Sequence, residues 1–270
     1  MIVLLPLLLL ALGFMLYLLA LQGRQRHSGW EKLENARYAH RGLHGNGVAE
    51  NSMTAFRLAV EKGYGIELDV HRLSDGTLAV IHDGTLLRTT GCEGRVEDLT
   101  AAELASYRLE GTEDTIPAFR QVLELVAGKV PLIVELKVAE HNYAALTDAV
   151  CEMLAGYSGP YCVESFDPRC IHHLRKNHPQ VIRGQLAENF FRSKAQITWQ
   201  QKLCMTCQLA NFLTQPDFVA YRFAHRKRLG VFLAKHFWGL HTVGWTIKTR
   251  EDLTQAEKEK WIPIFEGFTP

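Results

Sequence analysis

The sequence predicts an α/β fold in which eight strand–helix units close into a barrel. From about residue 36 onwards, short apolar runs alternate with stretches that carry apolar residues at helical spacing. The alternation gives eight units in about 235 residues, which is the size of a (β/α)8 barrel of the TIM type. An uncharged apolar run before residue 36 adds one expected transmembrane helix. A doubly wound parallel sheet is the alternative that the same alternation allows.

The expected transmembrane helix covers residues 2–21, with the sequence IVLLPLLLLALGFMLYLLAL. Its 20 uncharged residues would measure about 30 Å at about 1.5 Å per residue, the thickness of one hydrocarbon core. A cleaved signal peptide is the competing interpretation. The run lacks a basic start and shows no clear A-x-A cleavage site, so we expect an uncleaved membrane anchor.

Basic residues follow this run and none precedes it; they are Arg24, Arg26, Lys32 and Arg37. The positive-inside rule then predicts a single-pass membrane protein with the rest of the chain in the cytoplasm. We expect a transmembrane anchor over residues 1–24, a juxtamembrane linker over 25–35 and a barrel domain over 36–270.

The composition limits the classes of partner. The chain has 270 residues, 47% of them hydrophobic, and a formal net charge of +1. This balance argues against a disordered chain and against a nucleic-acid-binding protein, so no nucleic-acid partner is expected. Six cysteines are scattered through a chain that is long enough to bury a core without disulfides, which fits a reducing compartment.

Eight apolar runs are the expected barrel strands. They cover residues 37–42, 65–70, 132–137, 161–166, 181–186, 218–223, 241–247 and 262–268. One further run, residues 77–83, follows the second strand after only a short Ser-Asp-Gly turn, so the two should form an antiparallel hairpin outside the barrel. Helices are expected over residues 53–63, 117–128, 143–156 and 167–177, where apolar residues recur at helical spacing.

Two connections are longer than ordinary loops and should be helical insertions. They are residues 84–116, a small inserted segment, and residues 187–217. An apolar stripe at helical spacing lies in the second insertion, formed by Trp199, Leu203, Cys207 and Phe212. Most such stripes pack in a core. In a membrane-anchored barrel, the alternative is a surface that lies on the bilayer near the mouth of the site.

Carboxylates mark the ends of two neighbouring strands. Glu67 and Asp69 are two residues apart on one strand, so both side chains point to the same face. Glu135 should face them from the next strand. Three carboxylates without a thiol suit a hard divalent ion, Mg²⁺ or Ca²⁺. Lys137 lies two residues after Glu135 and adds a positive charge on the same face.

Two histidines are expected beside these carboxylates. His40 and Arg41 end the first strand, and His82 ends the return of the hairpin. If the hairpin turn centres on residues 75–76, His82 lies opposite Asp69. Cations and a hard metal bind an anion such as a phosphate, and two histidines can pass protons near neutral pH. This set predicts metal-assisted cleavage of a phosphodiester.

The motifs that carry these residues form a longer series: HRG (40–42), EN (50–51), ELDV (67–70), DG (75–76), HD (82–83), ELK (135–137), ESF (164–166) and WTI (245–247). In order and spacing the series resembles the glycerophosphodiester phosphodiesterase family, over essentially the whole chain after residue 36. The resemblance implies a TIM-like barrel with an inserted small segment, a divalent metal, and hydrolysis of glycerophosphodiesters to sn-glycerol 3-phosphate and an alcohol.

The resemblance also implies residue roles. His40 and His82 look like the acid/base pair, with His40 as the expected base and His82 as the expected acid. The metal ligands would be Glu67, Asp69 and Glu135, and the substrate contacts Arg41, Lys137 and Trp245. For Trp245 the residues leave two interpretations open, stacking on the glycerol moiety or packing in the wall.

Three positions depart from the family pattern. Ala49 stands where proline is usual before EN, the last strand reads IFEGF instead of a variant of IITD, and Gly244 precedes Trp245. None of them is an expected acid/base or metal position, so the departures bear on substrate preference.

Two other functions stay open. One is an enzyme of the same chemistry that acts on whole phospholipids at the membrane, such as a lysophospholipase D with a lysophospholipid substrate. The other is a catalytically silent, membrane-tethered module that binds phosphodiester head groups. A silent module has no need of two proton carriers, which argues against it.

Overall fold

The structure is a computed structural model that describes residues 4–24 and 27–270. Within these residues, nine strands form one sheet, and eight of them are parallel and close into a barrel. The eight are β1 (Tyr38–His40), β2 (Gly65–Arg72), β4 (Leu132–Leu136), β5 (Tyr161–Ser165), β6 (Arg183–Ala187), β7 (Phe218–Arg222), β8 (His241–Ile247) and β9 (Ile262–Phe265). Pairing of β1 with both β2 and β9 closes the barrel and excludes the doubly wound sheet.

Strand β3 (Leu78–Val80) pairs antiparallel with β2, as the short turn predicts. The predicted register is wrong by one residue. Val70 lies opposite Val80, so the position opposite Asp69 is Ile81, whose backbone N–H donates to the Asp69 carbonyl. His82 lies beyond the end of β3, where strand alternation no longer sets side-chain direction, and it still reaches the mouth of the barrel.

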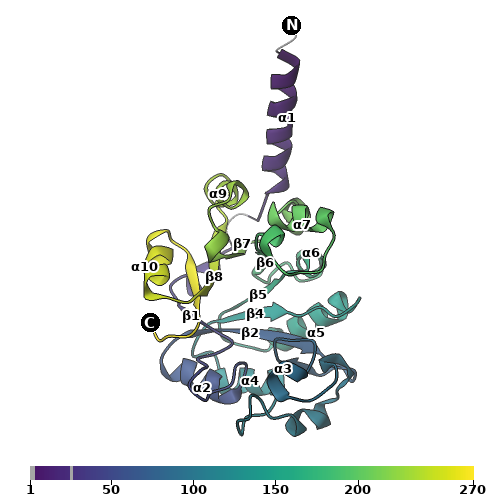
Figure 1. Ribbon diagram of the computed structural model, residues 1–270, viewed down its shortest axis with the longest axis vertical. Coiled ribbons are helices and arrows are strands. Elements are labelled where there is room, and N and C mark those ends of the chain that lie inside the picture. The colour runs from purple at the N-terminus through teal and green to yellow at the C-terminus, as the bar shows by residue number, and fades with distance from the viewer. Residues whose placement is uncertain (1–3, 25–26) are drawn as a thin grey trace.

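Helices cover the outside of the barrel (Figure 1). They are α2 (Met53–Glu61), α4 (Phe119–Val126), α5 (Tyr143–Ala155), α6 (Pro168–Asn177), α9 (Leu229–His236) and α10 (Arg250–Lys258). Helix α2 shows how the sequence sets a boundary. The Ser52 side chain accepts a hydrogen bond from the Ala55 N–H and caps the helix, which then buries Phe56 and Ala59 against the strands.

Alternation along the strands separates the core from the site. Ala39, Leu68 and Val134 point outward and pack with the helices in the main core. Tyr38 and Ile133 point inward and fill the floor of the barrel together with Trp30. On β1, β2, β4 and β5 the next inward position is polar, so charged groups line this side of the mouth at the carboxyl ends of the strands.

Both long connections contain short helices. The first holds α3 (Leu87–Thr90), η2 (Val96–Asp98) and η3 (Ala101–Ser106), and a small core of its own packs it on the hairpin. The second holds η4 (Phe190–Arg192), α7 (Trp199–Thr206) and α8 (Asn211–Thr214). The remaining single turns are η1 (Trp30–Lys32) and η5 (Phe223–His225).

Helix α1 (Leu4–Ala20) projects away from the barrel (Figure 1). The expected transmembrane helix over residues 2–21 is not supported: none of the helices in the described ranges has both the length and the apolar character needed to cross a bilayer. Residues 2 and 3 of the expected span lie outside the described residues.

The expected linker is not extended where the structure describes it. Trp30 and Leu33 are buried in the floor of the barrel, and the Trp30 ring stacks on His241 with ring centroids 4.2 Å apart. Just before it, the Arg24 guanidinium pairs with the Asp217 carboxylate at 2.5 Å. This segment therefore holds α1 on the barrel.

Candidate active site

Strand register brings the predicted site residues together. His40 of β1 lies beside Glu67 of β2, and Asp69 of β2 lies beside Glu135 of β4. Glu135 in turn lies beside Glu164 of β5. All five side chains are inward positions near the carboxyl ends of adjacent strands. His40, Glu67, Glu135 and Glu164 line a single cavity, and Asp69 is fully buried beside them.

Three of the carboxylates converge closely enough to hold a metal ion. Oxygen atoms of Glu67, Asp69 and Glu135 lie within 4.8 Å of one another, and all three side chains are buried. Burial and then the neighbouring carboxylates raise the pKa of Glu67 well above its usual range, and burial raises that of Glu135 to about 7. Repulsion of this kind is relieved by a cation between the carboxylates, and an all-oxygen donor set fits a hard divalent ion.

Glu164 extends this acidic wall. Its Oε2 atom is buried and has no hydrogen-bond partner, and burial raises its pKa well above the usual range. The structure places it against Glu135, at the edge of the carboxylate group.

Two cations flank the carboxylates. The Lys137 ammonium lies 2.7 Å from Glu135 Oε1 and 2.9 Å from Asp69 Oδ1. The Arg41 Nε atom lies 3.4 Å from Asp69 Oδ2, and Arg41 Nη1 donates to Glu50 at 2.9 Å. Although burial raises the pKa of Asp69, Lys137 and its other positive neighbours outweigh it and lower that pKa below the usual range. Asp69 therefore stays ionised beside its two protonatable neighbours.

Backbone geometry at the end of β1 holds Arg41 in place. Arg41 has a φ of 55° and its backbone N–H donates to Glu67 Oε2 at 3.0 Å. Gly42 follows with a φ of 78°, and a Cβ there would lie 2.8 Å from the Ala55 Cβ. Only glycine fits that approach of the loop to α2. Asn51, at a φ of 52°, donates its side-chain N–H to Asp69 Oδ2 at 2.8 Å.

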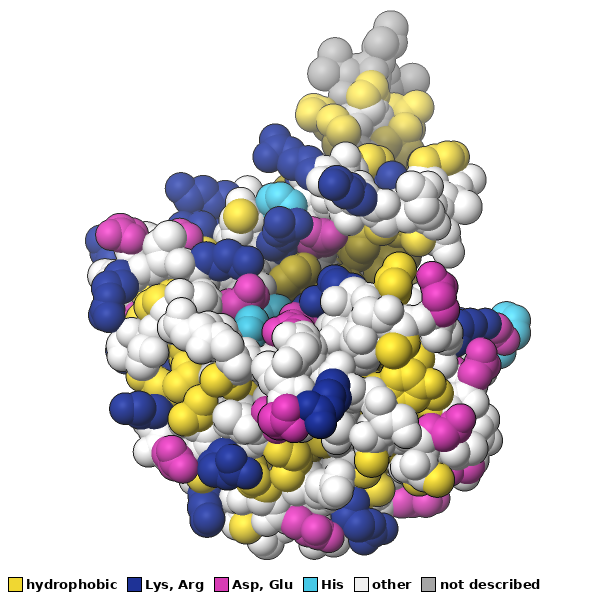
Figure 2. Space-filling model, turned by 60° about the horizontal axis from the view of Figure 1, so that its bottom comes forward, with side chains coloured by type: hydrophobic (Ala, Val, Ile, Leu, Met, Phe, Trp, Pro, Cys, Tyr) yellow, Lys and Arg dark blue, Asp and Glu magenta, His cyan; other side chains and the backbone are white. Residues whose placement is uncertain are grey.

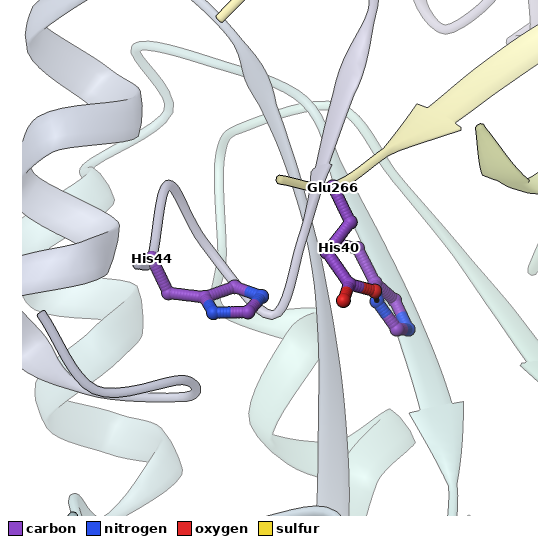
Figure 3. A group of neighbouring side chains, drawn as sticks. All are labelled: His40, His44 and Glu266. Atoms are coloured by element: carbon purple, nitrogen blue, oxygen red, sulfur yellow. Dashed lines mark hydrogen bonds and ion pairs between the residues drawn. The ribbon is translucent and has the colours of Figure 1, made fainter. Parts of the chain in front are cut away.

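His40 pairs with a carboxylate that the sequence did not indicate. His40 Nδ1 lies 2.7 Å from Glu266 Oε2, while His40 Nε2 lies 3.9 Å from Glu67 Oε2 and faces the carboxylate group. Figure 3 shows His40 and Glu266 side by side, with His44 on the loop after β1. The hydrogen bond from His40 lowers the pKa of Glu266 to about 2. Burial lowers the pKa of His40, against the opposing effect of Glu266.

His82 has a partner of the same kind. Its Nδ1 atom lies 2.6 Å from Asp83 Oδ1, which leaves Nε2 free to face the cavity. Arg88 of α3 bonds to Asp83 and, at 2.6 Å, to Glu50. Burial lowers the pKa of His82 to about 4, helped by Lys137 and Arg41 and opposed by Asp69. A chain of ion pairs thus links His82 to the group that holds Arg41.

Trp245 lines the same cavity and is also packed. Its indole N–H donates to the Ala220 carbonyl at 3.2 Å, and its ring meets Phe166 edge-on at 5.6 Å. The indole is therefore held rigidly, with part of the ring open to the cavity.

The cavity over the carboxylates has a volume of about 540 Å³ and includes His40, Arg41, His82 and Trp245 in its lining. A second cavity of about 970 Å³ shares His82 and Glu135 with the first. It continues past Lys137 to Gln201, Cys204 and Met205 on α7. The site thus opens toward the second insertion.

Several of these residues were missed or undervalued from sequence. Glu266 follows the last barrel strand, and the rule that site residues collect at strand ends could have found it. Asp83 directly follows His82 in the HD motif, and that position is a usable signal. Arg88 lies in the small inserted segment, where nothing in the sequence marks it.

A (β/α)8 barrel that gathers carboxylates, histidines and cations at the carboxyl ends of its strands is suited to hydrolysis of a phosphodiester. The model of the glycerophosphoryl diester phosphodiesterase family matches residues 40–265. The chain therefore belongs to the glycerophosphoryl diester phosphodiesterase family.

Known relatives agree with this membership. A Bacillus altitudinis protein named glycerophosphodiester phosphodiesterase is 42% identical over 126 residues, which cover 43% of this chain and 51% of that protein. Rat glycerophosphodiester phosphodiesterase 1 is 28% identical over 253 residues, covering 81% of this chain and 73% of that protein. The chain spans about half the length of the Bacillus relative.

The fold is shared with solved structures. A phosphodiesterase from Oleispira antarctica, in complex with the product sn-glycerol-3-phosphate, superposes with a TM-score of 0.74 at 22% identity. The match covers 88% of this chain and 95% of that one.

Proposed function

We propose that the protein hydrolyses glycerophosphodiesters to sn-glycerol 3-phosphate and an alcohol, with Mg²⁺ or Ca²⁺ as cofactor. One observation carries the proposal: carboxylate oxygens of Glu67, Asp69 and Glu135 lie within 4.8 Å of one another, beside a cavity that His40 and His82 line. Family membership and the names of the relatives support the choice of substrate.

The metal ion would be held by Glu67, Asp69 and Glu135. When bound, it would stabilise negative charge on the phosphoryl oxygens. Lys137 and Arg41 lie beside the same carboxylates, so they would hold the remaining phosphate oxygens and position the phosphorus atom.

Proton transfer would be divided between the two histidines. Glu266 holds Nδ1 of His40, so Nε2 is the atom that accepts the proton of the attacking hydroxyl. As the new P–O bond forms, the bond to the alcohol breaks. The departing alcohol oxygen would take a proton from Nε2 of His82, which Asp83 orients. Because burial lowers the pKa of His82 to about 4, this role requires the negative charge of the bound phosphate to raise that pKa until Nε2 is protonated. If the attacking hydroxyl belongs to water, this one step gives sn-glycerol 3-phosphate. If it is the 2-hydroxyl of the substrate's glycerol, the step gives a cyclic phosphate, which water must then open with the two histidine roles reversed.

Single alanine variants at the two histidines test this assignment. His40→Ala and His82→Ala should each lose nearly all turnover of glycerophosphocholine and keep Mn²⁺ binding, since neither is a proposed metal ligand. His141→Ala is the matched control because His141 is exposed and far along the chain from both. Near wild-type rates in both site variants would refute the mechanism. A folded wild-type protein that binds diesters without turnover would be the silent binding module.

A lipid substrate is the second candidate. Helix α1 exposes leucines on all sides, including Leu5, Leu8 and Leu10, and such a surface is unfavourable in water. We infer that α1 associates with a membrane and that the barrel lies on the cytoplasmic side, which the six free cysteines support because they fit a reducing compartment. Lysophospholipids in that membrane would then be within reach of the site.

A further inference from the structure

Exposed apolar side chains are concentrated in one part of the barrel. In the ranges that the structure describes, Leu87 is the one large exposed hydrophobic residue that lies neither on α1 nor between residues 191 and 237. The others outside α1 are Phe191, Trp199, Leu203, Phe212, Leu213, Leu229, Phe232 and Phe237. The apolar stripe of the second insertion, which was expected to pack in a core, is therefore partly on the surface. Trp199 is 64% exposed and Leu203 is 40% exposed.

The same segment is strongly basic. Residues 190–237 contain eight Lys and Arg residues and a single acidic residue, Asp217. Asp217 is buried and paired with Arg24, so it presents no negative charge to solvent. Arg222 and Arg226 form ion pairs, and Lys235 donates to backbone carbonyls instead. The other five form no ion pair within the described residues; these are Arg192, Lys194, Lys202, Lys227 and Arg228. Figure 2 shows Lys and Arg side chains gathered between the base of α1 and the hollow in the barrel.

Helix α1 is fixed against this surface. The Trp238 indole N–H, just after α9, donates to the Leu18 carbonyl at 2.7 Å. Helices α7 and α9 flank the base of α1 (Figure 1). The apolar helix and the basic, apolar surface therefore face the same side of the molecule.

We propose that residues 191–237 form an interfacial surface that docks on a lipid layer containing anionic headgroups. Its aromatic and leucine side chains enter the headgroup region, while its unpaired Lys and Arg side chains contact lipid phosphates. A soluble protein partner would not need an apolar helix beside the surface, whereas a lipid layer accommodates both.

Docking in this orientation places the site at the lipid. The cavity that contains Glu135 and Lys137 is also lined by Gln201, Cys204 and Met205 of α7. A diester with one acyl chain could keep its chain beside α7 while its phosphate reaches Lys137. This choice of substrate rests on the proposed function; the docking itself does not.

Tryptophan fluorescence tests the docking on the full chain. Trp199 is the one large exposed tryptophan in the described residues, and lipids with brominated acyl chains quench indoles that they touch. We expect quenching in phosphatidylcholine vesicles that contain phosphatidylglycerol, weakened by salt, and most of it lost in Trp199→Phe. Equal quenching in wild type and Trp199→Phe would overturn the proposal, because the quenched indole would then be Trp238, which is bonded to Leu18 at the base of α1.

A charge on α9 provides a second test. Phe232→Glu should reduce the quenching of Trp199 and slow hydrolysis of vesicle-borne lysophosphatidylcholine several-fold. The matched control is Leu87→Glu, at an exposed apolar position on the first insertion, residues 84–116. It should change neither the quenching nor the rate of hydrolysis. Self-association in the absence of lipid that Phe232→Glu abolishes would instead assign the surface to a second copy and overturn lipid docking.

The experiments distinguish failure of lipid docking from failure of the proposed hydrolytic function. Hydrolysis of water-soluble glycerophosphocholine should be unchanged in Phe232→Glu. If the wild type quenches on anionic vesicles but hydrolyses neither substrate, the docking stands and the proposed function fails. If the wild type hydrolyses glycerophosphocholine but is not quenched on anionic vesicles, the proposed function stands and lipid docking fails.

Discussion

Glu266 lies 2.7 Å from Nδ1 of His40, although 226 residues separate them in the chain. Closure of the barrel by β9 and β1 creates this pair, because Glu266 follows the strand that pairs with the strand ending at His40. The carboxylate orients the imidazole so that its other nitrogen faces the metal-binding carboxylates. A carboxylate in this position also favours the protonated imidazole.

Glu266→Gln separates orientation from charge. The amide oxygen can still accept from Nδ1–H, but the negative charge that raises the pKa of His40 is gone. The pKa of His40 should therefore fall. If His40 is the base, the acidic limb of the pH–rate profile moves to lower pH, and kcat falls by up to about 10²-fold as part of the acid–base contribution is lost. Glu259→Gln, which pairs with Arg226 away from the site, is the control. An unchanged profile would contradict the role of Glu266.

Glu67→Gln should stabilise the metal-free protein. The raised pKa of Glu67 in the folded state means that stability falls as pH rises above its unfolded value of about 4.5. The variant removes this loss, so its Tm in EDTA at pH 7 should exceed that of the wild type by a few degrees, on the scale of about 2–4 °C per kcal/mol. The rise in Tm on adding Mg²⁺ or Ca²⁺ should disappear. A metal-induced rise as large as in the wild type would exclude Glu67 as a ligand; exposed Glu251→Gln is the control.

Lys137→Met should affect metal and substrate in opposite directions. Without the ammonium, Glu135 and Asp69 lose a competitor for the cation, so Mn²⁺ should bind at least as tightly as in the wild type. The phosphate loses a charge-assisted contact worth about 1.5–3 kcal/mol, which lowers kcat/KM by roughly 10- to 150-fold. Metal titration followed by electron paramagnetic resonance, together with steady-state kinetics, measures both. Weaker metal binding with an unchanged kcat/KM would place Lys137 outside the phosphate site.

Gly42→Ala tests the loop that carries Arg41. At Gly42 an added Cβ would lie 2.8 Å from the Ala55 Cβ, and alanine would also have to adopt a left-handed φ. Gly63 has a similar φ of 71°, but nothing lies within 4 Å of a Cβ added there. Gly42→Ala should therefore destabilise the protein by about 1–3 kcal/mol more than Gly63→Ala. Urea unfolding of the two variants gives the difference. If both variants lose the same free energy of unfolding, the loop accommodates the added Cβ at Gly42 by shifting, and the close approach to Ala55 contributes nothing to stability.

Local patterns predicted much of the architecture because period-2 runs and helical spacing both report burial. All eight barrel strands and the hairpin formed where apolar runs indicated them. Strand ends then predicted the convergence of Glu67, Asp69 and Glu135. Contacts between the first and last strands, where the barrel closes, are harder to predict from sequence. The His40–Glu266 pair depends on which strands become neighbours and on where the last strand ends.

Two further differences have physical causes. The hairpin register depends on turn geometry, so a shift of one residue was invisible in the apolar pattern. The exposure of Trp199 and Leu203 was also hidden, because an apolar stripe has the same spacing on a core face and on a lipid-facing one.

The most direct test of the account is release of sn-glycerol 3-phosphate from glycerophosphocholine by the full chain. Protein stripped with EDTA should release none, and added Mg²⁺ or Ca²⁺ should restore the release in the wild type but not in His40→Ala. Release that EDTA leaves unchanged would contradict the role of the three carboxylates. No release with either metal, from a protein shown to be folded, would contradict the proposed substrate.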